Sequence, residues 1–310
     1  MKPRGLTLFT LVFTAFFGIT TESRADAPQV VASIKPVHSL VAVVMKGVGE
    51  PTLLVNGAGS PHTYALRPSE VRILSRADIV FWVGPDFEIF LQKPLQALAS
   101  NALSVALMDQ SPVMVLSGRA NGLLSAHEHQ DARARDGHIW LDPINAIAMV
   151  QVITRSLQKS DAVNAKIYAD NAAATIFALE NLDAELRRQL EPLQTTPFVV
   201  FHDAFQYFEK RYGLNAIGSV VVTPEQMTSV KRIATMKVAI ERLRPACIYS
   251  EPSAEPGLLK VLLEGTDLRL GTLDPEGAVL SSGRGFYFNL MRKLAYDFGS
   301  CLSEAAQNVR

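Results

Sequence analysis

A stretch without glycine or proline, from Asp161 to Leu190, constrains the fold of this chain more than any other feature. Its apolar residues recur at near-helical spacing, which predicts a single helix of almost thirty residues. At 1.5 Å per residue, such a helix extends about 45 Å and can connect two folded units. The 310 residues of the chain also exceed what one hydrophobic core usually supports.

Short apolar runs alternate with helix-like segments on both sides of this stretch. Before it they are Val30 to Ile34, Thr52 to Val55, Asp78 to Val83 and Ser104 to Leu107. After it they are Pro197 to Phe201, Ala216 to Val222, Ala246 to Ser250 and Leu268 to Thr272. Runs that are apolar on both faces and separated by helices are typical of buried parallel strands. The sequence therefore predicts two α/β domains with mainly parallel sheets, joined by one long rigid helix.

The predicted boundaries divide the chain into four parts. Residues 1–25 form a signal peptide, 26–158 an N-terminal α/β domain, 159–192 the bridging helix and 193–310 a C-terminal α/β domain. A polar loop is expected at 110–137 within the first domain, because Ser, Gly, Ala, Arg and Asp dominate there.

The first residues have the order of a secretory signal peptide. Lys2 and Arg4 precede an apolar run from Leu6 to Ile19, and small residues follow up to Ala25. The apolar run is shorter than a membrane-spanning helix requires. Because no cysteine near the predicted cleavage point could accept a lipid, we expect a free periplasmic protein.

The balance of charge limits the classes of partner. The chain has 30 basic and 30 acidic side chains, so no strong net charge favours nucleic acid or anionic lipid. Its only two cysteines are Cys247 and Cys301. In an exported protein we expect them to form one disulfide, since a zinc site of two thiolates would require them to stay reduced.

Three of the six histidines lie where functional residues of α/β proteins gather. His202 directly follows a predicted strand, His138 follows the polar loop, and His62 lies in a loop after the strand that ends at Val55. Three such histidines from two domains could meet only in a cleft between those domains. Neutral imidazoles suit zinc, whereas carboxylate-rich sites suit manganese.

Three segments carry a specific resemblance. PHTYALRPSE at 61–70, GHIWLDP at 137–143 and FHDAFQYFEKRYGL at 201–214 resemble the signature stretches of periplasmic zinc-binding proteins of the ZnuA type. ASIKPVHSL at 32–40, ADIVFWVGPDFE at 77–88 and GTLDPEG at 271–277 support it, and the likeness runs in order over almost the whole mature chain.

The resemblance implies a solute-binding protein of a high-affinity zinc ABC importer, not an enzyme. It implies two α/β domains bridged by one long helix, Zn²⁺ in the interdomain cleft, and one disulfide in the second domain. His62, His138 and His202 correspond to the metal ligands. The implied partners are an inner-membrane permease and its ATPase, and we expect a monomer.

The fourth ligand position is left open. Members of the zinc type often have an acidic residue before the first ligand, but this chain has Pro61. Asp274 corresponds to a carboxylate ligand of manganese-type relatives, so Asp274, water or an open position are the alternatives. Asp142 and Asp203 are candidates to orient the imidazoles, or simply to cap turns.

The remaining histidines define weaker candidates. His127 and His129 flank Glu128 in the polar loop, where zinc-type members have a longer histidine-rich insertion. They form a possible weak second zinc site or a solvated loop tip. His38 is expected to begin the first helix, with an accessory ligand role as the less favoured alternative.

Other functions compete with zinc transport. Manganese or iron binding within the same family is favoured by Asp274. An exported zinc hydrolase would need a general base, for which Glu251 after a predicted strand is the candidate. An adhesin-like surface protein is disfavoured by the missing lipid cysteine.

Overall fold

The computed structural model describes residues 27–56, 61, 64–119, 135–221, 230–252 and 256–307. The predicted signal peptide, His62, His127 and His129 therefore lie outside the described residues. No helix within the described part of the chain is both long enough and apolar enough to cross a membrane.

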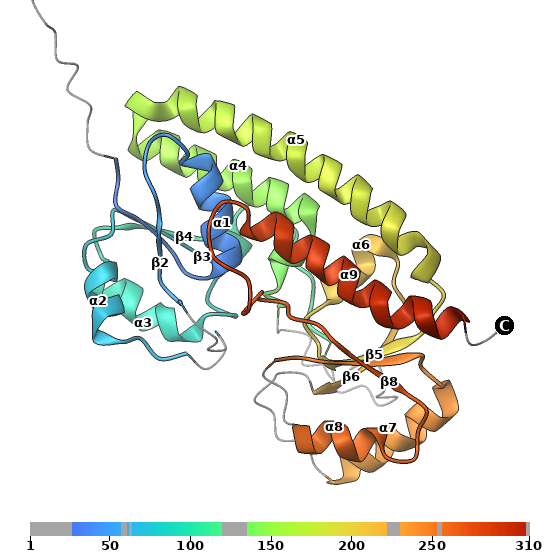
Figure 1. Ribbon diagram of the computed structural model, residues 1–310. Coiled ribbons are helices and arrows are strands. Elements are labelled where there is room, and N and C mark those ends of the chain that lie inside the picture. The colour runs from blue at the N-terminus through green and yellow to red at the C-terminus, as the bar shows by residue number, and fades with distance from the viewer. Residues whose placement is uncertain are drawn as a thin grey trace, which may run out of the picture.

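Two four-stranded parallel sheets form the framework (Figure 1). The first has the order β2-β1-β3-β4 and consists of β1 (Val30–Ala32), β2 (Thr52–Leu53), β3 (Ile79–Trp82) and β4 (Leu103–Ala106). The second has the order β6-β5-β7-β8 and consists of β5 (Phe198–His202), β6 (Ala216–Val221), β7 (Cys247–Ser250) and β8 (Arg269–Thr272). All eight predicted strands are present, each within a few residues of its expected position. We call the parts built around the first and second sheets the N-terminal unit and the C-terminal unit.

The helices of the described residues complete both units. They are α1 (Lys35–Val44), α2 (Pro68–Leu74), α3 (Ile89–Leu98), α4 (Pro143–Ser160), α5 (Ala165–Leu190), α6 (Gln206–Tyr212), α7 (Val230–Leu243), α8 (Pro256–Leu263) and α9 (Phe286–Gln307). Two further helices, α4 and α9, both pack against α5 and were not predicted from the sequence.

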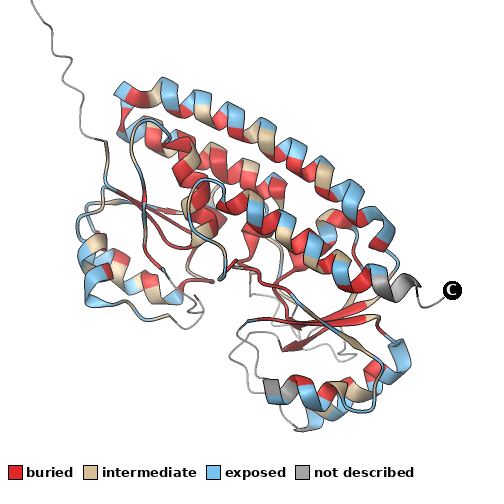
Figure 2. Ribbon diagram, in the orientation of Figure 1, coloured by how far each residue is buried: buried red, intermediate tan, exposed pale blue. Residues whose placement is uncertain are grey.

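One hydrophobic core continues through both units, and each sheet has a smaller core on its outer face. Alternate residues of β3 show this division, because Phe81 belongs to the shared core whereas Val80 and Trp82 belong to the outer core. In β5, Val200 faces the shared core and Val199 the outer one. Successive strand side chains point to opposite faces of a sheet, so a strand covered on both faces is apolar throughout. Figure 2 shows the resulting buried strands.

The predicted long helix is present as α5, with 26 residues. Asp161 organises the turn before it, since its carboxylate accepts hydrogen bonds from Asn164 Nδ2 at 2.8 Å and Tyr168 Oη at 2.7 Å. The helix ends where Pro192 follows in a short 3₁₀ turn. Its buried stripe contacts both units, as the prediction of a rigid connection requires.

A second helix also passes between the units. The segment after β8 returns to the N-terminal unit, and α9 then runs beside α5 toward the C-terminal unit (Figure 1). Lys35 at the start of α1 fixes this segment by donating to the carbonyl oxygens of Gly277, Ala278 and Leu280 at 3.3, 2.9 and 3.0 Å. Both α5 and the segment that leads into α9 therefore connect the two units. Two connections restrict hinge motion between the units more than one helix would.

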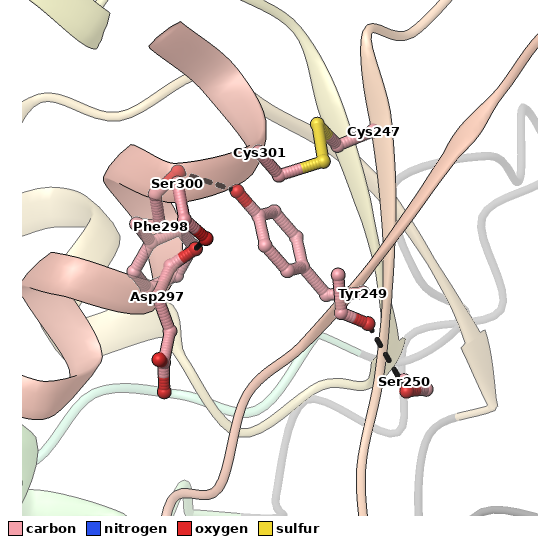
Figure 3. The surroundings of a disulfide bond; sticks show 8 residues. Cys247, Tyr249, Ser250, Asp297, Phe298, Ser300 and Cys301 are labelled. Atoms are coloured by element: carbon pink, nitrogen blue, oxygen red, sulfur yellow. Dashed lines mark hydrogen bonds between the residues drawn. A yellow bond between two sulfur atoms is a disulfide. The ribbon is translucent and has the colours of Figure 1, made fainter. Parts of the chain in front are cut away.

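The disulfide joins Cys247 in β7 to Cys301 in α9, with Cα atoms 6.3 Å apart (Figure 3). This agrees with the predicted pairing. Beside it, Tyr249 Oη donates to the carbonyl oxygen of Phe298 at 2.7 Å. The disulfide and this hydrogen bond attach α9, the second connection between the units, directly to the second sheet.

Candidate metal centre

His138 lies in an aromatic surrounding formed by the N-terminal unit. Its ring centroid is 5.1 Å from that of Phe87 and 5.4 Å from that of Trp140. Gly137 makes this possible, because a Cβ at that position would lie 2.6 Å from Cβ of Phe87. All three rings are buried, so the imidazole is shielded from solvent.

Asp136 orients the His138 imidazole. Its Oδ1 lies 2.8 Å from Nδ1 of His138 and accepts a hydrogen bond from the His138 backbone nitrogen at 3.0 Å. A carboxylate can only accept, so the hydrogen is on Nδ1 and the lone pair of the neutral imidazole is on Nε2. This arrangement is the usual one for histidine ligands of metals.

His202 has a corresponding partner in the C-terminal unit. It is the last residue of β5, and Glu251 follows the end of the neighbouring parallel strand β7. Nδ1 of His202 lies 3.1 and 3.2 Å from the two carboxylate oxygens of Glu251. Its lone pair is therefore on Nε2 as well.

The two imidazoles meet across the boundary between the units. Their ring centroids are 5.1 Å apart, with an angle of 62° between the ring planes. They come from residues 64 positions apart in the chain. Two imidazoles, each fixed through Nδ1 by a buried carboxylate, form the start of a nitrogen-ligand site of the kind that zinc prefers.

The rest of the predicted ligand set is not established by these contacts. Within the described ranges, no three His, Cys, Asp or Glu side chains are arranged to hold a metal ion. His62 lies outside those ranges, although its neighbour Pro61 is described and buried. The three-histidine site therefore stays a prediction.

Asp274, the candidate fourth ligand, organises its own turn. Oδ1 accepts from the Glu276 nitrogen at 3.1 Å, and Oδ2 accepts from the Ala278 nitrogen at 2.6 Å. Trp140 Nε1 donates to the carbonyl oxygen of the adjacent Pro275 at 2.9 Å, which connects this turn to the His138 segment. Each carboxylate oxygen can still accept a second bond, so the ligand role stays a prediction.

Asp142 and Asp203 do not orient the imidazoles in the structure. Asp142 caps α4 by accepting from the Ile144 nitrogen at 2.8 Å. Asp203 pairs with Arg119, which also pairs with Glu209 at 2.8 Å. Burial raises the pKa of Glu209 to about 7 despite this pairing.

The role of Asp136 and Glu251 as the carboxylates that orient the imidazoles was not predicted from the sequence. Asp136 could have been found from its position two residues before His138. Glu251 is 49 residues from His202, and only the pairing of β5 with β7 brings them together. Glu251 was considered as the base of a hydrolase, but its carboxylate faces His202.

His38 does not begin α1 but lies inside its first turns. Its Nε2 is 3.1 Å from the carbonyl oxygen of Pro51, and burial lowers its pKa. This contact accounts for the buried imidazole of His38 without a metal ion.

The family described as the periplasmic zinc-uptake complex component A, ZnuA, matches residues 30–301. The chain belongs to this family.

Individual relatives of the ZnuA family match nearly the whole chain. The high-affinity zinc uptake system protein ZnuA of Brucella suis biovar 1 (strain 1330) is 40% identical over 306 residues, covering 89% of this chain and 92% of the relative. A crystal structure of ZnuA superposes with a TM-score of 0.76 at 22% identity, covering 89% of this chain and 100% of that one. The periplasmic zinc binding protein TroA from Treponema pallidum has a TM-score of 0.75 at 22% identity and covers 89% and 99%. These two structures support the fold.

Proposed function

We propose that this protein is the periplasmic solute-binding component of a high-affinity zinc ABC importer. It captures Zn²⁺ with His62, His138 and His202 in the cleft between the units and delivers the ion to a membrane permease driven by an ATPase. The observation that carries this proposal is the pair of imidazoles 5.1 Å apart, each with Nδ1 held by a buried carboxylate. Membership of the ZnuA family supports the choice of zinc.

The proposed chemistry suits transport. Imidazole ligands are neutral and bind zinc without a change in their own charge, while the hydrogen-bonded carboxylates increase their basicity. A site shared by two units can release the ion when the units move slightly apart. The domain boundaries stay as predicted from the sequence, with residues 159–192 as the bridge, and we retain the monomer and the periplasmic location as parts of the proposal.

The test is a titration of the metal-free mature protein with Zn²⁺ in competition with a chelator. His62→Ala, His138→Ala and His202→Ala are expected to weaken binding by orders of magnitude. The matched control is His38→Ala, whose imidazole already contacts Pro51. Unchanged affinity in the three ligand variants would overturn the proposed site.

Manganese or iron binding is the alternative within the same family. Competing Mn²⁺ or Fe²⁺ against Zn²⁺ in this titration distinguishes the ions, and Asp274→Ala tests the carboxylate that would favour manganese. We expect the protein to bind Zn²⁺ in preference to Mn²⁺ or Fe²⁺. We also expect Asp274→Ala to lower zinc affinity less than the histidine variants do. Preference for Mn²⁺ would refute the zinc assignment.

A further inference from the structure

The two imidazoles are supported in different ways. His202 is held by Glu251, which belongs to the same sheet. His138 is held by Asp136, but Asp136 is itself held by α6, which belongs to the C-terminal unit. Gln206, the first residue of α6, donates from Nε2 to Oδ2 of Asp136 at 3.2 Å and to the carbonyl oxygen of Ser117 at 3.0 Å.

The next residue of α6 fixes the backbone of the same segment. Tyr207 Oη donates to the carbonyl oxygen of Asp136 at 2.7 Å and accepts from the Leu116 nitrogen at 2.9 Å. Asp136 in turn donates from its nitrogen to the carbonyl oxygen of Leu116 at 2.9 Å. Asp136, Gln206 and Tyr207 are all buried, so water does not readily replace these partners.

We infer that Gln206 is a positioning residue that makes the metal-binding orientation of His138 depend on the docking of α6. The inference rests on the proposed function. Oδ1 of Asp136 holds the imidazole, and Gln206 fixes the other oxygen, so the amide prevents the carboxylate from rotating away. Without Gln206, the Asp136 carboxylate is held only through Oδ1, by the His138 backbone nitrogen at 3.0 Å. The acceptor of Nδ1 is then less firmly fixed, and the geometry of Nε2 toward an ion becomes less defined.

The consequence for ion release follows from the chain order. His202 and Gln206 belong to one short segment, four residues apart. A displacement of this segment from the N-terminal unit would move one ligand and remove the support of the other. Both ligands would therefore weaken together, which makes release more cooperative than the loss of a single ligand.

The experiment compares Gln206→Met with the unmodified protein. Methionine has a similar length but no amide donor. We measure the zinc dissociation constant by chelator competition and the ¹⁵N imidazole signals of His138 in the metal-free protein. We expect affinity to fall about tenfold, the lower end for groups that orient ligands, and the ¹⁵N signals to move from a single tautomer toward a mixture.

The control is Gln194→Met, which removes a comparable hydrogen bond to the carbonyl oxygen of Tyr212 within the C-terminal unit. It is expected to leave both readouts unchanged. If Gln206→Met does not fold, Gln206→Asn carries the same test, because its shorter side chain cannot reach Asp136. Normal affinity and normal His138 signals in the Gln206 variant would overturn the inference.

His138→Ala separates this failure from failure of the proposed site. If His138→Ala loses zinc binding while Gln206→Met does not, only the positioning role of Gln206 is refuted. If His138→Ala also binds zinc normally, the proposed site and the inference fall together.

Discussion

Glu251 holds His202 from the end of a neighbouring strand, with Nδ1 of the imidazole 3.1 Å from one carboxylate oxygen. The same oxygen lies 3.2 Å from the His202 backbone nitrogen, so one carboxylate fixes both the ring and the chain. Replacing it with an amide removes the negative charge that supports the imidazole as a ligand.

We therefore expect Glu251→Gln to lower zinc affinity about 10- to 100-fold, measured by chelator competition. Glu264→Gln is the matched control, since Glu264 lines the same cavity of about 680 Å³ as Glu251 but has no role at His202. Unchanged affinity in Glu251→Gln would contradict the orienting role. Zinc-dependent ester hydrolysis that this variant abolishes would instead favour the hydrolase alternative.

Lys35→Met should destabilise the protein by about 2 kcal/mol, because a charged donor leaves three carbonyl oxygens of the segment before α9. The free energy of unfolding in urea measures this effect. Lys46→Met, at an exposed lysine just after α1, is the control and is expected to change stability little. Equal free energies of unfolding of the two variants would show that the hydrogen bonds of Lys35 do not stabilise the connection between the units.

Removal of the disulfide should cost about 4 kcal/mol in the loop-closure model, because it closes a loop with a sequence separation of 54 residues. The double variant Cys247→Ala and Cys301→Ala is compared with the oxidised protein by urea denaturation. Zinc affinity of the folded variant should stay the same, since the contacts of His138 and His202 within the described part of the chain do not involve either cysteine. A large loss of zinc affinity under folding conditions would mean that the disulfide also shapes the site.

The stability of the metal-free protein should depend on pH through Glu88. Burial raises its pKa from 4.5 to about 7, although its carboxylate accepts from the Val83 nitrogen at 2.6 Å. Between these values the folded protein retains a proton that the unfolded chain has released. The contribution of Glu88 to stability is therefore complete below about pH 4.5 and lost as the pH rises through about 7.

Glu88→Gln removes this dependence, because an amide does not titrate. Relative to wild type, the variant should gain about 1 to 3 kcal/mol in unfolding free energy between about pH 5 and about pH 8. Glu180→Gln, on the exposed side of α5, serves as the control and should show the wild-type dependence. A constant difference between Glu88→Gln and wild type would rule out the raised pKa.

The double variant His127→Ala and His129→Ala tests the predicted second zinc site, which lies outside the described residues. We expect the zinc stoichiometry to fall from two to one if the loop binds an ion, as measured by calorimetry. Near the ends of this loop, Arg119 pairs with Glu209 and Arg135 pairs with Asp109. An unchanged stoichiometry would leave the loop without a metal-binding role.

Local sequence patterns were sufficient to predict much of the fold. The absence of glycine and proline over almost thirty residues predicted α5, and continuous apolar runs predicted the parallel strands, because both signals act within a few residues. The helix α9 was missed, since its apolar stripe lacks so long an uninterrupted stretch and its packing against α1 and α5 depends on the completed sheets.

The sequence by itself determined two α/β units, their long helical connection and the strand end at which His202 lies. Only the tertiary structure decided that His202 meets His138, that Glu251 and Asp136 orient them, and that α6 supports Asp136. The physical reason is the sequence separation of the residues in contact. Helices and strands form from neighbouring residues, whereas these contacts join residues up to 71 positions apart and depend on strand order and on the docking of the two units.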